Sequence, residues 1–283
     1  MNIQKTINIK GTLFNLSTPL VMGIVNITPD SFYANSRKET NADIVDQVRQ
    51  MLVEGASIID IGAQSTRPSA QFLSATEEIE RLVPALDSIR KHCPEAILSV
   101  DTFYADVAKL CVKEYGVAMI NDISGGDIDK KMFETVAQLR VPYVLMHMQG
   151  TPQTMLHKTH YADLIQDISY YFSQKTALLH QMGVNDIIID PGFGFSKDID
   201  QNYQLMKQLS FFQNFNLPLL VGVSRKSMIS KLLGNTASEA LNGTTVLNTY
   251  ALLNGANILR VHDVKEAMEV VSILHKIEQA PDL

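Results

Sequence analysis

"IIIDPGFGFS", at residues 187–196, is a run of isoleucines that leads into Asp190 and then into a turn. Short runs of β-branched residues are typical of strands buried on both faces of a parallel sheet. Proline and glycine interrupt regular structure directly after Asp190. An unpaired carboxylate is costly to bury, so we expect Asp190 to lie at a strand end, facing a partner, a ligand or water.

Seven other segments have the same composition, short and rich in Ile, Val and Leu. Together with residues 186–192, they are 20–26, 57–63, 96–102, 118–124, 142–148, 218–224 and 257–263. Stretches with helical spacing lie between them and include residues 42–56, 76–92 and 263–277. The last of these opens with Asp263 and Glu266, a D-x-x-E pattern that predicts a capping box.

Eight strands, each followed by a helix, predict an α/β fold of the (β/α)8 TIM barrel type. The polar-alternating residues 5–16 predict an N-terminal β-hairpin. The alternative is an open doubly wound sheet, which a GxGxxG pattern after the first strand would favour and which GIVNITPDSF (23–32) does not provide. No linker or low-complexity segment divides the chain, so we expect residues 1–283 to form a single domain.

The composition restricts the class of protein. The chain has 283 residues and is 46% hydrophobic, enough to build a large core. Its net charge of -6 argues against nucleic-acid binding, which needs a basic face. No apolar run is long enough for a membrane span. Cys93 and Cys111 form no CxxC pattern, so we expect buried free thiols and a cytoplasmic protein.

Polar residues recur at the ends of the predicted strands, and the carboxyl ends of barrel strands meet at one rim. They are Asn26, Gln64, Arg67, Asp101, Asn121, Asp122, His147, Asp190, Ser224, Arg225, Lys226, Arg260 and His262. Carboxylates such as Asp101 and Asp190 accept the paired N–H groups of a 2-amino-4-oxo heterocycle, and Asn121 offers a further acceptor. An Arg side chain such as Arg260 can stack on such a ring, and Lys226 adds a donor.

A second group of these residues is suited to anions. Asn26, Arg67, Arg260 and His262 lie at predicted strand ends, and a helix is predicted to begin near residue 263. An Asn carbonyl beside a diphosphate also suits Mg²⁺, which takes few protein ligands and several phosphate oxygens. His147 either lines this rim or supports it, and the pattern favours neither role.

Eight motifs together resemble those of the dihydropteroate synthases, in the same order and setting, from about residue 20 to about residue 270. They are MGIVNITPDSF, DIGAQSTRP, SVDT, MINDISGG, LMHMQGTP, DPGFGF, VGVSRKS and RVHDV. The resemblance implies an enzyme of folate synthesis that joins 6-hydroxymethyl-7,8-dihydropterin diphosphate to p-aminobenzoate and releases diphosphate. It also implies Mg²⁺ as cofactor and a homodimer, for which residues 236–256 offer an Ala- and Leu-rich surface.

Residue roles follow from the resemblance at matching positions. The pterin pocket is implied for Asp101, Asn121, Met146, Asp190, Lys226 and Arg260, of which Asp101, Asp190, Lys226 and Arg260 are expected to be catalytic. The p-aminobenzoate site is implied for Thr66, Arg67, Pro68, Phe195 and Ser224. The diphosphate site is implied for Asn26, Arg67, Arg260 and His262, with Asn26 as metal ligand. The family reaction is SN1-like, and loops matching residues 27–37 and 64–74 close over it.

The chain departs from the family where Gly-Gly-Glu commonly precedes Ser-Thr-Arg-Pro-Gly. Here Ala63 and Gln64 stand in that triplet, and Ser69 follows Pro68. These changes bear on loop closure and inhibitor response, not on the pterin pocket.

Three other functions remain open. A methyltetrahydrofolate-dependent methyltransferase shares a pterin-binding barrel, but it would not need the diphosphate group around Asn26. A Schiff-base aldolase would use Lys226, whose polar neighbours favour a binding site instead. A catalytically silent pterin-binding protein is the third alternative, because Gln64 replaces an acid.

Overall fold

A closed barrel of parallel strands forms the centre of the protein. The computed structural model describes residues 5–27, 37–64 and 72–281. The strands are β3 (Leu20–Asn26), β4 (Ile58–Gly62), β5 (Leu98–Asp101), β6 (Met119–Asp122), β7 (Tyr143–Met146), β8 (Ile187–Asp190), β9 (Leu220–Val221) and β10 (Ile258–Val261). Their order is β8-β7-β6-β5-β4-β3-β10-β9, and a parallel bridge between Ile189 and Leu219 joins the two edges. The predicted (β/α)8 barrel is therefore confirmed.

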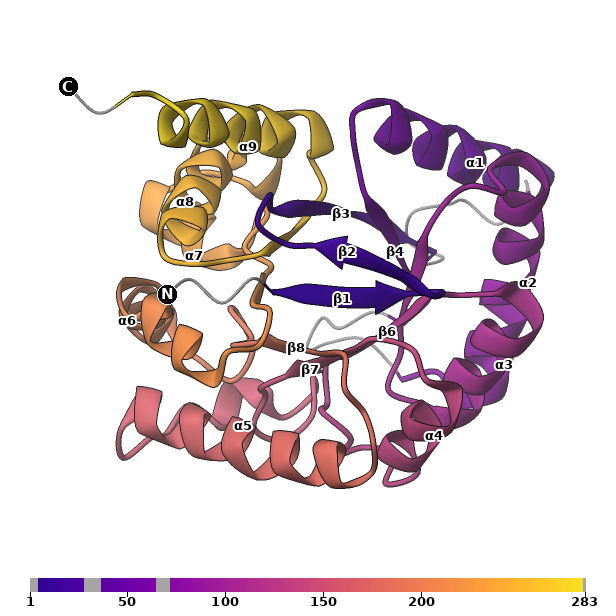
Figure 1. The fold of residues 1–283 in the computed structure, drawn as a ribbon, viewed down its shortest axis with the longest axis horizontal. Helices are drawn as coiled ribbons and strands as arrows, with labels where there is room; N and C mark the ends of the chain where they lie inside the picture. Colours follow the sequence, from indigo (N-terminus) through magenta and orange to yellow (C-terminus); the bar gives the residue numbers. More distant parts are fainter. Residues whose placement is uncertain (1–4, 28–36, 65–71, 282–283) are drawn as a thin grey trace.

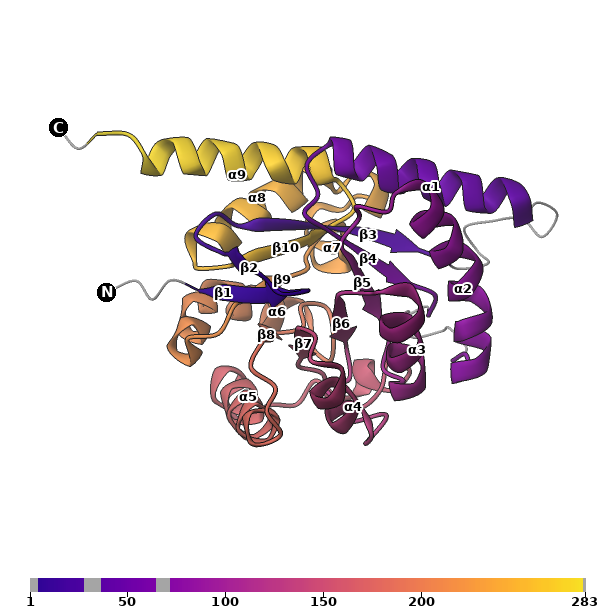
Figure 2. The same ribbon diagram turned by 45° about the vertical axis from the view of Figure 1, so that its right-hand side comes forward.

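Helices form a layer around this barrel (Figures 1 and 2). They are α1 (Arg37–Val53), α2 (Ala75–His92), α3 (Ala105–Tyr115), α4 (Met132–Leu139), α5 (Leu164–Gln181), α6 (Ile199–Lys207), α7 (Ser227–Leu233), α8 (Leu241–Leu253) and α9 (Val264–Glu278). The Ile, Val and Leu of each strand alternate between the barrel interior and these helices, because successive side chains of a strand point to opposite faces. Both strand faces are therefore apolar over most of their length.

One predicted helix start is wrong in its detail. Asp263 precedes α9, but its side chain makes no capping bond to the helix. Its two oxygens instead accept from Nε and Nη2 of Arg225, both at 2.8 Å. A bidentate, charge-assisted pair competes successfully with a single capping bond. A capping box does form at α2, between Ser74 and Glu77.

The predicted N-terminal hairpin is present and lies across one end of the barrel. Strands β1 (Thr6–Ile9) and β2 (Thr12–Asn15) pair antiparallel. Lys10 and Gly11 turn the chain with φ angles of 51° and 83°. Ile7 and Ile9 pack on the lower interior of the barrel, against residues such as Met22 and Ile58. The hairpin thus closes the end where the strands begin.

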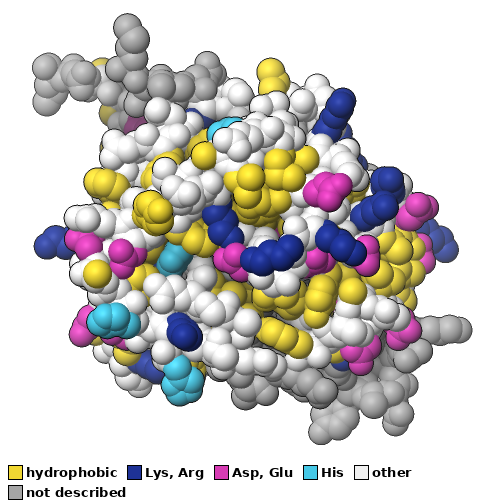
Figure 3. All heavy atoms as spheres, turned by 90° about the horizontal axis from the view of Figure 1, so that it is seen from below, with side chains coloured by type: hydrophobic (Ala, Val, Ile, Leu, Met, Phe, Trp, Pro, Cys, Tyr) yellow, Lys and Arg dark blue, Asp and Glu magenta, His cyan; other side chains and the backbone are white. Residues whose placement is uncertain are grey.

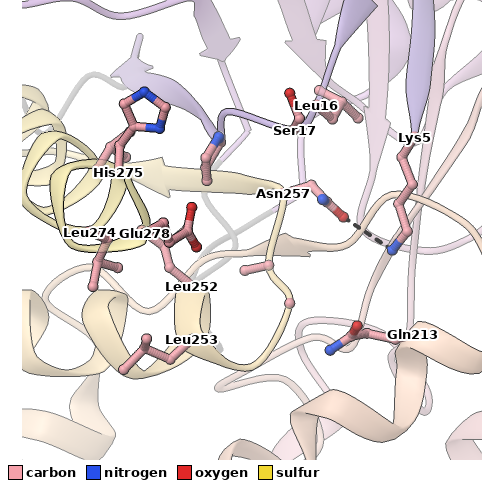
Figure 4. Close-up of a pocket in the computed structure, with 14 residues that line it drawn as sticks. Lys5, Leu16, Ser17, Gln213, Leu252, Leu253, Asn257, Leu274, His275 and Glu278 are labelled. Carbon is pink, nitrogen blue, oxygen red and sulfur yellow. Dashed lines mark hydrogen bonds between the residues drawn. The ribbon is translucent and has the colours of Figure 1, made fainter. Parts of the chain in front are cut away.

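A cavity of about 430 Å³ lies at this same end, between the hairpin, α8 and α9 (Figure 4). Lys5 reaches across it, and its Nζ donates to Oδ1 of Asn257 at 3.3 Å. The cavity is remote from the residues predicted to act on a ligand, because those residues stand at the opposite ends of the strands. The candidate functional site is therefore at the carboxyl ends of the strands.

The cysteines, the helices and the charged surface residues bear on the predictions made from composition. Cys93 and Cys111 are buried and free, as predicted. In the described residues, no helix combines the length and the apolar character needed to cross a membrane. On the face shown in Figure 3, acidic and basic side chains are interspersed.

Candidate active site

Strand register brings the predicted pterin-binding residues to one end of the barrel. Asp101 ends β5 and pairs with Asn121 in β6, while Met146 ends β7 and pairs with Asp190 at the end of β8. Arg260 lies in β10. Strand β3 pairs with β10 on one side and with β4 on the other. Closure of the sheet is what brings these strands around a common centre.

Arg260 is held between two carboxylates from neighbouring parts of the barrel. Its Nη2 donates to Oδ2 of Asp101 at 2.8 Å, and its Nε donates to Oδ2 of Asp60 at 2.7 Å. Burial raises the pKa of Asp101 to about 7, against the opposing effect of Arg260. Burial and the Arg260 guanidinium therefore act on the pKa of Asp101 in opposite directions.

Asp190 is a buried carboxyl anchored by its own turn. Its Oδ1 accepts from the backbone N–H of Gly192 at 2.8 Å, and its carbonyl accepts from the N–H of His147 at 2.9 Å. Burial raises the pKa of Asp190, while the positive charge of Lys226 lowers it. The remaining acceptor capacity of Asp190 suits ligand N–H groups, as its place in the sequence predicts.

Lys226 and Phe195 form a polar and an apolar side of the same site. The Lys226 ammonium donates to the carbonyl of Phe193 and lies 4.6 Å from the centre of the Phe195 ring. Burial lowers the pKa of Lys226 to about 8, and Asp190 opposes that effect. Lys226 is therefore still mainly protonated at pH 7 and available as a donor.

His147 supports the rim, which resolves the two roles that the sequence allowed. It is buried, and its Nδ1 lies 3.1 Å from Nζ of Lys197. Nζ of Lys197 also donates to the carbonyls of Gly192 and Phe195, each at 3.0 Å. Burial lowers the pKa of His147 well below its usual range. The turn after Asp190 is thus fixed from behind by a neutral imidazole and a buried lysine.

Three of the predicted anion-binding residues, Asn26, Arg260 and His262, lie at β3 and β10, and the fourth, Arg67, lies outside the described residues. His262 follows β10, and its backbone N–H donates to Oγ of Ser224 at 3.1 Å. The Ser224 hydroxyl is also 3.1 Å from Nδ1 of His262, and it can donate there because its oxygen already accepts from the backbone. Desolvation, followed by repulsion from Arg260, lowers the pKa of His262 to about 4. In the tautomer in which the Ser224 hydroxyl donates to Nδ1, the ring proton of neutral His262 is on Nε2 and can be donated to an anion.

Asn26 is the residue on this side of the site that could hold a magnesium ion. Asn26 ends β3 and is solvent-exposed, and its side chain carries an amide oxygen, a ligand type that suits Mg²⁺. Across the described parts of the chain, no group of three or more His, Cys, Asp or Glu residues could enclose a metal. Mg²⁺ needs no such cage when phosphate oxygens and water complete its shell. The donor set therefore suits an ion that arrives with a diphosphate.

The predicted p-aminobenzoate residues are only partly visible. Thr66, Arg67 and Pro68 lie outside the described residues, as does Ser69. Phe195 is partly buried and packs on a small apolar cluster above the barrel, formed by Phe103, Ile123, Met146, Met148 and Met155. This cluster forms an apolar wall that no single sequence motif predicts.

Gln64 links the end of β4 to the segment that precedes α2. Its Oε1 accepts from the N–H of Leu73 at 2.9 Å, and its Nε2 donates to the carbonyl of Leu73 at 3.2 Å and to Oε2 of Glu78 at 3.4 Å. Burial raises the pKa of Glu78 to about 7. Gln64 is uncharged, unlike the glutamate common at this position in the family, but both the oxygen and the NH2 group of its amide form hydrogen bonds.

Two of the strand-end residues bond to neighbouring loops. Asp122 accepts from the backbone of Ser124 and Gly126 and from the hydroxyl of Tyr143, all within 2.8 Å. Arg225 donates to Asp263 and to the carbonyls of residues 237 and 238. Both side chains stabilise loops that carry the site.

Asp60 and Lys197 were missed by the sequence interpretation. A charged residue inside an apolar run, as in SIIDIGA, is a signal that could have found Asp60. Lys197 gave no such signal, because it stands in a turn next to Asp198, where an exposed lysine is common.

Comparisons with known proteins agree with this geometry. Residues 22–262 match the family described as "Pterin binding enzyme". Dihydropteroate synthase of Escherichia coli strain K12 is 41% identical over 267 residues, covering 94% of each chain. The Yersinia pestis dihydropteroate synthase structure with a sulfonamide drug complex has a TM-score of 0.89 at 38% identity, covering 98% of this chain and 100% of that one. A Xanthomonas albilineans dihydropteroate synthase structure with 4-aminobenzoic acid has a TM-score of 0.90 at 33% identity, covering 99% and 100%.

The match over most of the chain, on a barrel with this rim, defines the class: the chain belongs to the pterin-binding enzyme family. Within that family it is a dihydropteroate synthase, a transferase of folate biosynthesis.

Proposed function

We propose that this chain condenses 6-hydroxymethyl-7,8-dihydropterin diphosphate with p-aminobenzoate, giving 7,8-dihydropteroate and diphosphate. The observation that carries the proposal is the joint position of Asp101, Asn121, Asp190, Lys226 and Arg260 at one end of the barrel. These side chains combine acceptors for the paired N–H groups of a pterin with donors for its ring oxygen and nitrogen.

The pterin is assigned to the side of the site lined by Asp101, Asn121, Met146 and Asp190. Arg260 stacks on its ring and, with Asn26, Arg67 and His262, faces the diphosphate. The p-aminobenzoate is assigned to Thr66, Arg67, Pro68, Phe195 and Ser224. The Ser224–His262 contact of 3.1 Å supports a shared boundary between the amine and diphosphate sides.

The reaction is proposed to be SN1-like. The bond between the pterin methylene carbon and the diphosphate oxygen breaks first, and its electron pair leaves with diphosphate. Donors from Arg260 and neutral His262 stabilise the charge that grows on that oxygen. The carboxylates of Asp101 and Asp190 favour the pterin cation. The amine nitrogen of p-aminobenzoate then bonds to the methylene carbon and loses a proton.

Mg²⁺ is the proposed cofactor, held by Asn26. It supplies positive charge to the diphosphate oxygens when bound. The exposure of Asn26 at the end of β3 supports this role.

Two alternative functions have less support. A methyltetrahydrofolate-dependent methyltransferase would leave the pair of Ser224 and His262 without an anion to bind. A silent pterin-binding protein was considered because of Gln64, but the amide of Gln64 is fully engaged with Leu73 and Glu78. The residues proposed for the pterin pocket, including Asp101, Asp190 and Lys226, are all present despite the glutamine at position 64.

Residues 1–283 are proposed to form a single domain in the cytoplasm. A homodimer is proposed through the neighbouring helices α8 and α9, where Val246, Tyr250 and Leu253 of α8 and Ile273 and Ile277 of α9 are exposed apolar residues. Light scattering after size exclusion should give twice the chain mass, and Val246→Asp should give a monomer. A monomeric wild type would exclude the dimer.

Diphosphate release is the assay for the function. We expect release from the pterin diphosphate to need p-aminobenzoate and Mg²⁺ for full rate, and a chelator to reduce it. Release that is indifferent to p-aminobenzoate would indicate hydrolysis and contradict the proposed condensation. Release that is indifferent to the chelator would exclude the metal role alone.

A further inference from the structure

Asp60 is a charged residue inside the barrel, below the rim. It lies in the middle of β4, where Ile59 and Ile61 pack toward the outer helices and Ile58 packs on the barrel interior. Alternation along the strand therefore directs Asp60 inward, as it does Ile58. Its side chain is fully buried.

A single oxygen of Asp60 joins two residues of the proposed pterin site. Its Oδ2 accepts from Nε of Arg260 at 2.7 Å and from Nδ2 of Asn121 at 2.9 Å. Its Oδ1 has no hydrogen-bond partner among the described residues. A buried carboxylate that uses one of its two oxygens is a poor source of stability, because desolvation opposes the gain from pairing.

The bonds to Asp60 determine what the two residues present to a ligand. A carboxylate only accepts, so the Asn121 amide must turn its NH2 group to Asp60, which leaves its oxygen as an acceptor. Arg260 donates through Nε to Asp60 and through Nη2 to Asp101, so Nη1 is the group that these carboxylates leave unused.

We propose that Asp60 is a positioning residue that fixes the Asn121 amide as an acceptor for pterin N–H groups and fixes the plane of Arg260. This inference rests on the proposed function and adds a residue to it. In this role Asp60 acts through its bonds to Asn121 and Arg260 and not through a contact of its own with the substrate.

Two substitutions separate the geometry from the charge. Asp60→Ala removes the acceptor, so Asn121 is free to turn over and Arg260 loses one of its two anchors. Asp60→Asn can keep both bonds through its carbonyl oxygen, with its NH2 group where Oδ1 has no partner. Asp60→Ala should therefore weaken binding of 6-hydroxymethylpterin by about 10–100-fold, the effect that loss of an orienting partner has at a metal ligand, and Asp60→Asn by much less.

The charge of Asp60 has a separate readout. The groups that act on Asp101 are Arg260, Asp60, Asp122, Lys226 and Glu78. Asp60 raises the pKa of Asp101, so Asp60→Asn should lower it. Pterin binding that requires ionised Asp101 should then persist to lower pH in Asp60→Asn than in the wild type. A purely structural role for Asp60 would not move this pH dependence.

The experiment is calorimetric titration of wild type and variants with 6-hydroxymethylpterin from pH 5 to 8, together with thermal unfolding. Ser99→Ala is the matched control, because Ser99 is buried and is the register partner of Asp60 in β5. Asn121→Ala removes one of the two residues through which Asp60 acts, so the losses of affinity in Asn121→Ala and Asp60→Ala should be less than additive in the double variant.

Normal affinity in a folded Asp60→Ala variant, or fully additive losses in the double variant, would overturn the positioning role. Failure of both Asp60 variants to fold would also overturn it and make Asp60 a structural charge. Absence of pterin binding in the wild type would contradict the proposed function itself, which is a distinguishable result.

Discussion

The side-chain nitrogen of Lys197 lies 3.1 Å from Nδ1 of His147, and both residues are buried behind the turn that follows Asp190. The ammonium form donates to His147 and to two carbonyls, whereas the amine form can accept from Nδ1–H of the imidazole. The contact therefore survives a change in the protonation of Lys197.

Lys197→Met should lower the free energy of unfolding by about 1–3 kcal/mol, because it leaves the carbonyls of Gly192 and Phe195 without their donor. Chemical denaturation measures this change. Lys207→Met is the matched control, since Lys207 is exposed on α6. Equal stability of the Lys197 variant and the control would show that the turn does not depend on Lys197.

The effect of Lys197 should also depend on pH. Burial lowers its pKa to about 7, while the pKa of an unfolded lysine is about 10.4. Between these values the unfolded chain binds the extra proton, so the stability of the wild type relative to Lys197→Met should rise with pH. The slope is at most about 1.4 kcal/mol per pH unit. A difference that shrinks from pH 7 to 9 would contradict the shift.

Asp190→Asn should weaken pterin binding by about 3–5 kcal/mol, roughly a hundred- to several-thousand-fold. The amide replaces one acceptor with a donor, which would meet a ligand N–H. Stability should change little or rise, because a buried carboxylate that awaits its ligand is strained. Pterin titration tests the affinity and thermal unfolding tests the stability. Asp200→Asn is the control, because Asp200 is an exposed residue of α6. Near-normal affinity would remove Asp190 from the pterin site, and loss of the fold would make it a structural charge.

Glu78→Gln should remove a pH-dependent loss of stability. Burial raises the pKa of Glu78 to about 7, above the ~4.3 of an unfolded glutamate. The protonated Glu78 carboxyl therefore stabilises the folded wild type fully below about pH 4, and this stability is lost as the pH rises to 7. Relative to the wild type, Glu78→Gln should gain about 2–4 kcal/mol between pH 4 and 8. Glu80→Gln, an exposed change on the same helix, should show no such trend, and equal behaviour of the two variants would contradict the account.

Local pattern was sufficient to predict the barrel and the side of it that carries the site. The strand segments are short apolar runs with polar residues at or just after their ends, and barrel geometry brings such ends together. The contact between Arg260 and Asp60 could not be predicted, because it joins residues 200 positions apart and depends on how the barrel closes. The same holds for Asp263, whose local pattern predicts a cap but whose oxygens are taken by Arg225 from the preceding loop.

The most direct test of the account is transfer of the nitrogen of ¹⁵N-labelled p-aminobenzoate to the pterin methylene carbon, followed by mass spectrometry. The account predicts ¹⁵N-labelled 7,8-dihydropteroate and an equal amount of diphosphate, with both greatly reduced in Asp190→Asn. Diphosphate without the labelled product, or no product from a folded wild type that is supplied with both substrates and Mg²⁺, would contradict it.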